Sequence, residues 1–129
     1  MKQETIKILK IEVGKEPYVK EIKNELKSLQ AEVGGLIQPL EIGAKTLAVI
    51  NEEGKINGSQ PNRWLGDNDI ICGDFFICGD DKESFSSLNE LQIEICSDYF
   101  KNIPEFTGQE EELVPHVEVY GFNPMGGLE

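Results

Sequence analysis

The chain has 129 residues, a net charge of -12 at neutral pH and three cysteines. A chain of this length forms one domain and buries enough surface to need neither a disulfide nor a metal for stability. The odd cysteine count, the lack of a secretory signal and the lack of an apolar run near ~18 residues predict a cytoplasmic protein with reduced thiols, and exclude membrane spanning.

The charge is unevenly distributed along the chain. Residues 1–35 contain seven Lys and six Glu, a balance of +1, whereas residues 36–129 contain five basic and eighteen acidic residues, a balance of -13. Such a field repels nucleic acid and anionic membranes and favours basic protein partners. The alternative interpretation is that the charge serves solubility alone.

The first third of the chain predicts a strand and then a helix. The strand covers Thr5–Val13, which is rich in β-branched residues. Pro17 suits the first turn of a helix, and Gly34 suits its left-handed C-terminal cap. The apolar residues between them recur at spacings of 3, 4, 3 and 4 and predict one helix face: Val19, Ile22, Leu26, Leu29 and Val33.

The middle of the chain predicts a hairpin followed by a long loop. Leu36–Ile42 is expected to form an edge strand because Pro39 cannot donate a ladder hydrogen bond. It is expected to pair with a strand at Leu47–Ile50. The connection from Asn51 to Asp69 is longer than loops in compact domains usually are, which indicates a functional or partly structured segment.

Asp69–Cys78 predicts a central strand that is buried on both faces. Alternation places Phe75 and Phe76 on opposite faces, and Gly73 indicates a bulge. A carboxylate at Asp74 inside such a strand needs a hydrogen-bonded or cationic partner.

A second helix is expected from Asn89 to about Asn102. Asn89 and Gln92 form a capping box, with Ser87 and Glu90 as a competing pair. The apolar residues expected to be buried are Leu91, Ile95, Cys96, Tyr99 and Phe100.

These elements predict one α+β domain over residues 1–104. Its mixed sheet has four or five strands, two helices pack on it, and the order is β-α-β-β-β-α-β. Residues 105–129 form an acidic C-terminal extension with a last strand expected at His116–Phe122.

The sequence contains no phosphate-binding loop, dinucleotide fingerprint, zinc-protease motif, nucleophile elbow or CxxC pair. The cysteines fall on predicted apolar faces, where thiols are inert, and the aspartates lack the spacing of a cation loop. No catalytic residue, cofactor or metal site is therefore predicted, and the protein is expected not to be an enzyme.

The long loop carries the most chemically versatile side chains of the chain. The candidate ligand-binding residues are Glu52, Glu53, Asn62, Arg63 and Trp64. Arg63 is the only arginine, and its fork suits a carboxylate or a phosphate. In the competing interpretation, which we favour, Arg63 pairs with Glu52, Glu53 or Asp74, and Trp64 covers the core.

Five short segments carry a family resemblance over about residues 5–102: VGG from Val33, NEEGK from Asn51, PNR from Pro61, GDFFICGDD from Gly73 and SLNELQIE from Ser87. With them the chain resembles the bacterial domain of unknown function family DUF3846. The resemblance implies a setting in phages, conjugative plasmids and other mobile elements of Gram-positive gut bacteria, and it implies no activity.

Together, the charge and the resemblance predict a non-enzymatic accessory protein of a mobile element that binds a basic protein partner. The alternative is a nucleotide-type ligand, bound or cleaved at the Arg63 loop.

Overall fold

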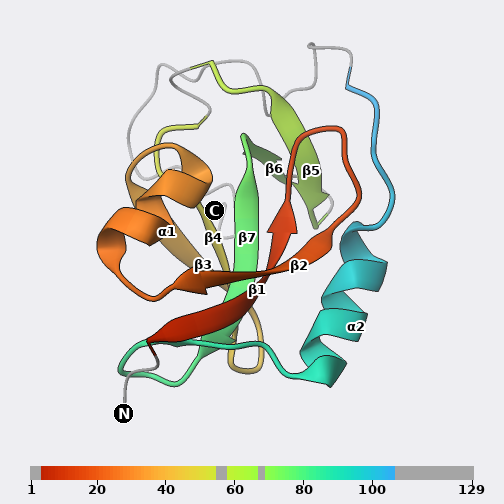
Figure 1. Ribbon diagram of the computed structural model, residues 1–129. Coiled ribbons are helices and arrows are strands. Elements are labelled where there is room, and N and C mark those ends of the chain that lie inside the picture. The colour runs from red at the N-terminus through yellow and green to blue at the C-terminus, as the bar shows by residue number, and fades with distance from the viewer. Residues whose placement is uncertain (1–3, 55–57, 67–68, 107–129) are drawn as a thin grey trace, which may run out of the picture.

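The computed structural model describes residues 4–54, 58–66 and 69–106 (Figure 1). Its elements in chain order are β1 (Thr5–Ile11), β2 (Tyr18–Lys23), α1 (Leu26–Val33), β3 (Ile37–Gly43), β4 (Thr46–Asn51), β5 (Pro61–Leu65), β6 (Asp69–Cys72), β7 (Phe75–Asp80), β8 (Phe85–Ser86) and α2 (Glu90–Phe100).

The main sheet has six strands in the order β2-β1-β7-β4-β3, with β8 paired to β7. Every pairing between described strands is antiparallel. The strands β5 and β6 form a separate two-stranded sheet. β3 lies at an edge, as Pro39 predicts, and it pairs with β4 as a hairpin.

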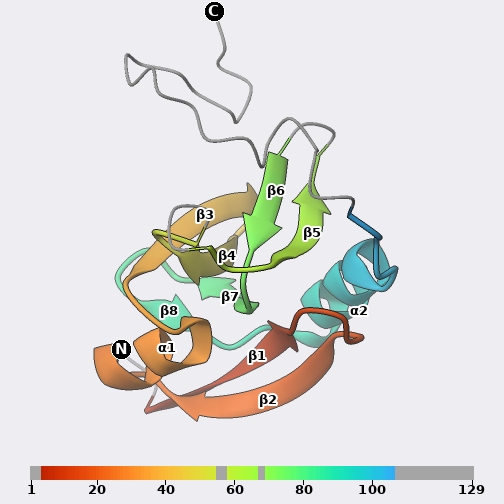
Figure 2. The ribbon, with the colours of Figure 1, turned by 90° about the horizontal axis from the view of Figure 1, so that it is seen from above.

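The two helices cover opposite faces of the main sheet (Figures 1 and 2). Leu29 and Val33 of α1 pack into one apolar cluster with Phe76. Phe100 of α2 belongs to the other cluster with Phe75, and the two rings meet edge to face at 5.5 Å. The β5–β6 sheet adds its own apolar residues to the α2 side. β7 therefore lies between two cores, and its burial on both faces follows.

The predicted helix from Pro17 to Val33 is wrong in its first half. Residues Tyr18–Lys23 form β2, which pairs with β1 so that Ile22 lies opposite Ile6 in the α1-side core. The helical spacing is overridden because a strand here supplies an outer partner for β1, and tertiary pairing outweighs local helical periodicity. The helix is confirmed over Leu26–Val33, and Gly34 closes it with φ 79°.

The predicted central strand is two strands that belong to different sheets. Gly73 has φ 86° and turns the chain between β6 and β7, so the residues before it pair with β5 and those after it enter the main sheet. Asp74 lies at this turn and accepts a hydrogen bond from the Val13 amide at 2.9 Å. Phe75 and Phe76 are fully buried in different clusters, which confirms their predicted opposite faces.

The α+β class is confirmed, but the sheet has more strands than predicted and no parallel pair among the described strands. The predicted element order is wrong at four points. β2 replaces the start of the first helix, and β5 lies within the long loop. The predicted central strand is divided into β6 and β7, and the short strand β8 follows. The strand expected at His116–Phe122 lies outside the described residues, and the domain boundary near residue 104 stays a prediction.

Candidate functional site

Asn62 and Arg63, the central pair of the predicted site, lie on β5 with their side chains inside the protein. Each has an exposed fraction of 2%. The Asn62 amide group donates to the carbonyl oxygens of Ile11 and Gly73, both at 2.9 Å, and its Oδ1 accepts from Arg63 Nη1 at 2.7 Å. Asn62 thus ties the end of β1 to the turn between β6 and β7.

Arg63 ties β5 to two further segments through its guanidinium. Nε donates to the Phe100 carbonyl at 2.9 Å, Nη2 donates to the Lys15 carbonyl at 2.5 Å, and Nη1 also reaches the Asn62 carbonyl at 3.2 Å. Phe100 is the last residue of α2. Its carbonyl lies at the negative end of the helix dipole, so its partial negative charge attracts the guanidinium as a carboxylate would, but more weakly.

The predicted pairing of Arg63 with Glu52, Glu53 or Asp74 is wrong. In the described part of the chain, the ion pairs involve lysines and none joins a carboxylate to Arg63. Burial lowers the pKa of Arg63 from its ordinary value. Backbone carbonyls satisfy the guanidinium instead, because they converge where β5 passes the end of α2 and the β1–β2 turn.

The other three predicted site residues lie elsewhere on the surface. Glu52 and Glu53 are exposed on the turn that follows β4. Trp64 is half-buried, and its ring lies 5.9 Å from that of Phe106 after α2. The five residues are therefore not gathered around one ligand position. Ligand binding at this loop stays a prediction, although the Asn62 and Arg63 side chains are taken up by the fold.

The second helix begins as predicted and then departs from the prediction in its packing. Asn89 and Gln92 form the capping box, with hydrogen bonds of 2.8 and 2.9 Å. Cys96 and Phe100 are buried, as expected. The prediction that Leu91, Ile95 and Tyr99 are buried is wrong, because all three side chains are more than half exposed.

An exposed apolar stripe therefore runs along the outside of α2. Its side chains are exposed to 63% at Leu91, 58% at Ile95, 55% at Tyr99 and 45% at Ile103. Leu91, Ile95 and Tyr99 recur every fourth residue within α2, so they lie above one another on one side of the helix, and Ile103 follows after the helix ends at Phe100. We call this set the α2 stripe.

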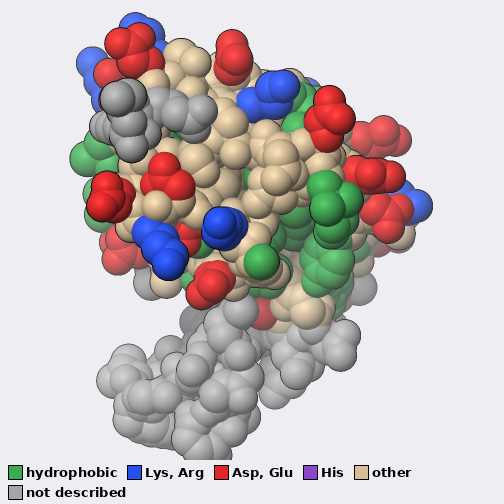
Figure 3. Space-filling view, turned by 90° about the horizontal axis from the view of Figure 1, so that it is seen from below, with side chains coloured by type: hydrophobic (Ala, Val, Ile, Leu, Met, Phe, Trp, Pro, Cys, Tyr) green, Lys and Arg blue, Asp and Glu red, His purple; other side chains and the backbone are tan. Residues whose placement is uncertain are grey.

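A row of exposed carboxylates lies beside the α2 stripe. Glu90, Glu94 and Asp98 each precede a stripe residue by one position, which places them on the side of the helix turned further from the core. Figure 3 shows the corresponding surface, with hydrophobic side chains gathered together and acidic side chains next to them. Asp98 pairs with Lys101 at 2.9 Å, but both side chains are exposed and the pair adds little.

Tyr99 fixes the C-terminal half of the stripe against the β5–β6 sheet. Its hydroxyl accepts a hydrogen bond from the Gly66 amide at 2.9 Å, and its ring packs edge to face on Phe100 at 4.7 Å. The Phe100 carbonyl also accepts the hydrogen bond from Arg63, so the buried arginine and the exposed stripe contact the same end of α2. The stripe is consequently held on a rigid element.

The three cysteine thiols lie in the interior of the protein. Cys72, Cys78 and Cys96 are all buried. Burial raises the pKa of Cys78 to about 12, with a further contribution from Asp80, and burial also raises the pKa of Cys96. A thiol with a raised pKa holds little nucleophilic thiolate at neutral pH.

Two further classes of site were sought in the described ranges. Residues 4–54, 58–66 and 69–106 contain no group of three or more His, Cys, Asp or Glu side chains positioned to hold a metal ion. Within the same ranges, neither helix has the length and apolar character that crossing a membrane requires.

The fold and surface define a small α+β domain with two apolar cores, a buried Asn62–Arg63 pair and an exposed apolar face on α2. The model of the family "Domain of unknown function (DUF3846)" matches residues 6–102, and the chain belongs to this family. No curated protein and no solved structure matches the chain.

Sequence reasoning missed the α2 stripe although its signal is present. The helix has apolar residues at positions 91, 95 and 99 as well as at positions 96 and 100, which are two adjacent stripes. A helix that packs on one sheet usually buries one apolar stripe, here the one at positions 96 and 100. The additional stripe at positions 91, 95 and 99 therefore indicated an exposed apolar surface.

Proposed function

We propose that this protein is a non-enzymatic accessory protein of a mobile genetic element, and that it acts by binding a basic protein partner through the outer face of α2. The α2 stripe with its adjoining carboxylates carries this proposal. The mobile-element setting is taken from the family resemblance, and a cytoplasmic location fits the buried free thiols.

The stripe favours a protein partner because it is apolar, continuous and rigid. Three large side chains at a four-residue repeat on α2, followed by Ile103 after its end, form a ridge of the kind that packs against another helix. Each of these side chains that a partner buries contributes about 1.5 to 3 kcal/mol. The capped start of α2 and the Tyr99–Gly66 hydrogen bond keep the ridge in place before binding.

The row at Glu90, Glu94 and Asp98 favours a basic partner. An amphipathic helix with apolar residues at every fourth position and Lys or Arg beside them would match both rows at once. Carboxylates at the rim select against acidic partners and against nucleic acid, whose phosphates they repel. The charge of residues 36–129 extends the same field beyond α2.

A peptide-display selection tests this proposal. Random peptides of about 16 residues, long enough for four helical turns, are selected on the full-length protein. We expect the enriched peptides to carry apolar residues three or four apart with Lys or Arg next to them. The double substitution Leu91→Gln, Ile95→Gln should weaken their binding by about a hundredfold, while Leu36→Gln, at an exposed leucine outside α2, leaves it unchanged.

The outcomes separate cleanly because the substituted side chains are exposed and the variants keep their fold. Failure to enrich any sequence, enrichment without a basic bias, or binding that survives the double substitution would each overturn the proposal. Salt supplies a second readout, since rim charges make association salt-dependent.

A nucleotide-type ligand at the Arg63 loop is the second candidate from the sequence. It has less support than partner binding, because Arg63 is 2% exposed and its donors are bonded to carbonyls. A thermal-shift screen with nucleotides and divalent cations tests it, and a specific rise of several degrees would favour it.

A further inference from the structure

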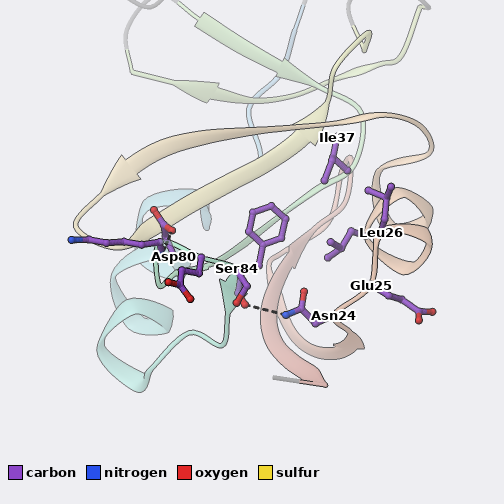
Figure 4. Close-up of a pocket in the computed structure, with 10 residues that line it drawn as sticks. Asn24, Glu25, Leu26, Ile37, Asp80 and Ser84 are labelled. Carbon is purple, nitrogen blue, oxygen red and sulfur yellow. Dashed lines mark hydrogen bonds between the residues drawn. The ribbon is translucent and has the colours of Figure 1, made fainter. Parts of the chain in front are cut away.

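A pocket lies on the face of the molecule that α1 covers, remote in sequence from α2. It has a volume of about 440 Å³, which is within the range that small ligands occupy. Its walls come from the β2–α1 junction, the start of β3 and the segment from Asp80 to Phe85 (Figure 4). Segments far apart in the sequence therefore meet around one hollow.

The interior of the pocket is apolar. Leu29 is buried, Ile37 and Phe85 are half-buried, and all three line the pocket. Leu26 also lines the pocket. Its side chain is 59% exposed, although it lies one helical turn from the buried Leu29. A ligand with an apolar body would cover this leucine and remove its surface from water.

Asn24 supplies a polar group that is aimed into the pocket. The residue is 6% exposed, and its Nδ2 donates to the Phe85 carbonyl at 3.1 Å. Among the described residues, none donates a hydrogen bond to its Oδ1, and Figure 4 shows this oxygen directed into the pocket. Since no buried side-chain oxygen of these residues lacks a partner, the Oδ1 is reached by solvent through the pocket. Asn24 Oδ1 is therefore an acceptor, held in place by the Nδ2 hydrogen bond, to which a ligand in the pocket can donate.

The charges around the pocket select the kind of donor. Asp80 and Glu83 lie on the wall opposite α1, and Lys82 is the single cation among the described lining residues. Glu25 also lines the pocket, but Figure 4 shows its side chain turned outward. This excess of carboxylates repels phosphate and carboxylate ligands and attracts a cation.

We propose that this pocket binds a small amphipathic amine, with the ammonium group donating to Asn24 Oδ1 and attracted by the carboxylates that line the pocket, and the hydrocarbon body lying on Leu26, Leu29 and Phe85. The site is separate from the α2 stripe. It takes a ligand of opposite charge to a nucleotide.

An NMR titration of the backbone amides with n-hexylamine tests the proposal, with hexan-1-ol and hexanoate as the neutral and anionic ligands of matched length. Hexylammonium should give saturable shifts at residues 24–29 and 84–85. Hexanol should bind about fivefold more weakly, and hexanoate more weakly still. Equal binding of the three, shifts elsewhere on the protein, or no saturation would overturn the proposal.

Two exposed leucines supply the matched variants. Leu26→Gln should weaken hexylamine binding about tenfold, because Leu26 lines the pocket. Leu36→Gln, at a leucine of similar exposure (54%) that does not line it, should leave binding unchanged. Glu83→Gln removes one exposed carboxylate without touching the apolar walls and should weaken the amine but not the alcohol. Identical affinities for the wild type, Leu26→Gln and Glu83→Gln would reject the site.

Discussion

The Asn62–Arg63 pair and the outer face of α2 occupy positions opposite to those that their side-chain chemistry suggests. An asparagine and an arginine are buried in the protein, while a leucine, an isoleucine and a tyrosine on α2 face the solvent. The pair is stabilised because each side-chain nitrogen donates to a carbonyl oxygen, which offsets the usual cost of burying polar groups. The α2 stripe has no such compensation within the described chain. The difference teaches that the polar pair serves the fold and the apolar stripe is the better indicator of function.

The largest contrast is expected within α2 itself. Phe100→Ala should lower the free energy of unfolding by about 3 to 5 kcal/mol, because it empties the space beside Phe75. Ile95→Ala, on the outer side of the same helix, should change it by less than about 0.5 kcal/mol. Urea denaturation of both variants measures the two values. Similar losses for the two variants would show that the outer face is part of the core.

Replacing Arg63 tests whether its role is structural. Arg63→Lys keeps the charge, but one ammonium does not span the Phe100 and Lys15 carbonyls that the guanidinium joins. We expect a loss of about 2 to 3 kcal/mol in the free energy of unfolding. Asn62→Ala should act on the same network, so the double variant should lose less than the sum of the two. An unchanged melting temperature for Arg63→Lys would return this residue to the list of ligand-binding candidates.

Glu32 provides a pH-dependent test on the opposite face of the sheet. Burial raises the pKa of Glu32, but the hydrogen bonds from Lys10 at 2.6 Å and Lys20 at 2.9 Å outweigh it, and the pKa lies below its ordinary value of 4.5. At a pH near the ordinary value of 4.5, Glu32 therefore stays ionised in the folded protein, whereas it begins to bind a proton in the unfolded chain. Its stabilisation is present above the unfolded pKa and is lost as the pH falls through the lowered folded value.

Glu32→Gln should accordingly cost about 1 to 3 kcal/mol at neutral pH, since Lys10 is buried beside it. The gap between wild type and variant should narrow as the pH falls below the ordinary glutamate value of 4.5 and through the lowered pKa of folded Glu32. Unfolding curves at several pH values measure this gap. A gap that stays constant down to the acid transition would contradict the assignment.

The smallest effect is expected from thiol reagents. Cys72, Cys78 and Cys96 should be labelled slowly in the native protein, because they are buried and the pKa values of Cys78 and Cys96 are raised. The unfolded chain in urea serves as the fully reactive control. Rapid labelling of one native thiol would revive an enzymatic interpretation.

The sequence predicted those features that depend on neighbouring residues. The capping box at Asn89, the left-handed Gly34 and the edge position of the Pro39 strand are all confirmed. Each follows from local backbone chemistry, which a short segment contains in full.

The features that the sequence did not predict depend on distant segments. Residues 18–23 form a strand because β1 lies beside them, and the chain turns at Gly73 because β5 captures the residues before it. Arg63 was expected to pair with a carboxylate, but it donates to the carbonyl of Phe100, at the end of the distant helix α2. The candidate loop site was therefore predicted from the chemistry of its residues alone, whereas their positions relative to one another depend on distant segments.

The central position of β7 has a consequence for synthesis of the protein. β7 joins β1 to β4, so the two N-terminal hairpins, β1–β2 and β3–β4, meet only through a strand that ends at Asp80. On the ribosome α1 can already pack on the β1–β2 hairpin, but the two hairpins cannot join into one sheet until β7 has left the exit tunnel. Because such long-range pairing closes slowly, the nascent chain passes through an aggregation-exposed interval that ends when residue 80 emerges.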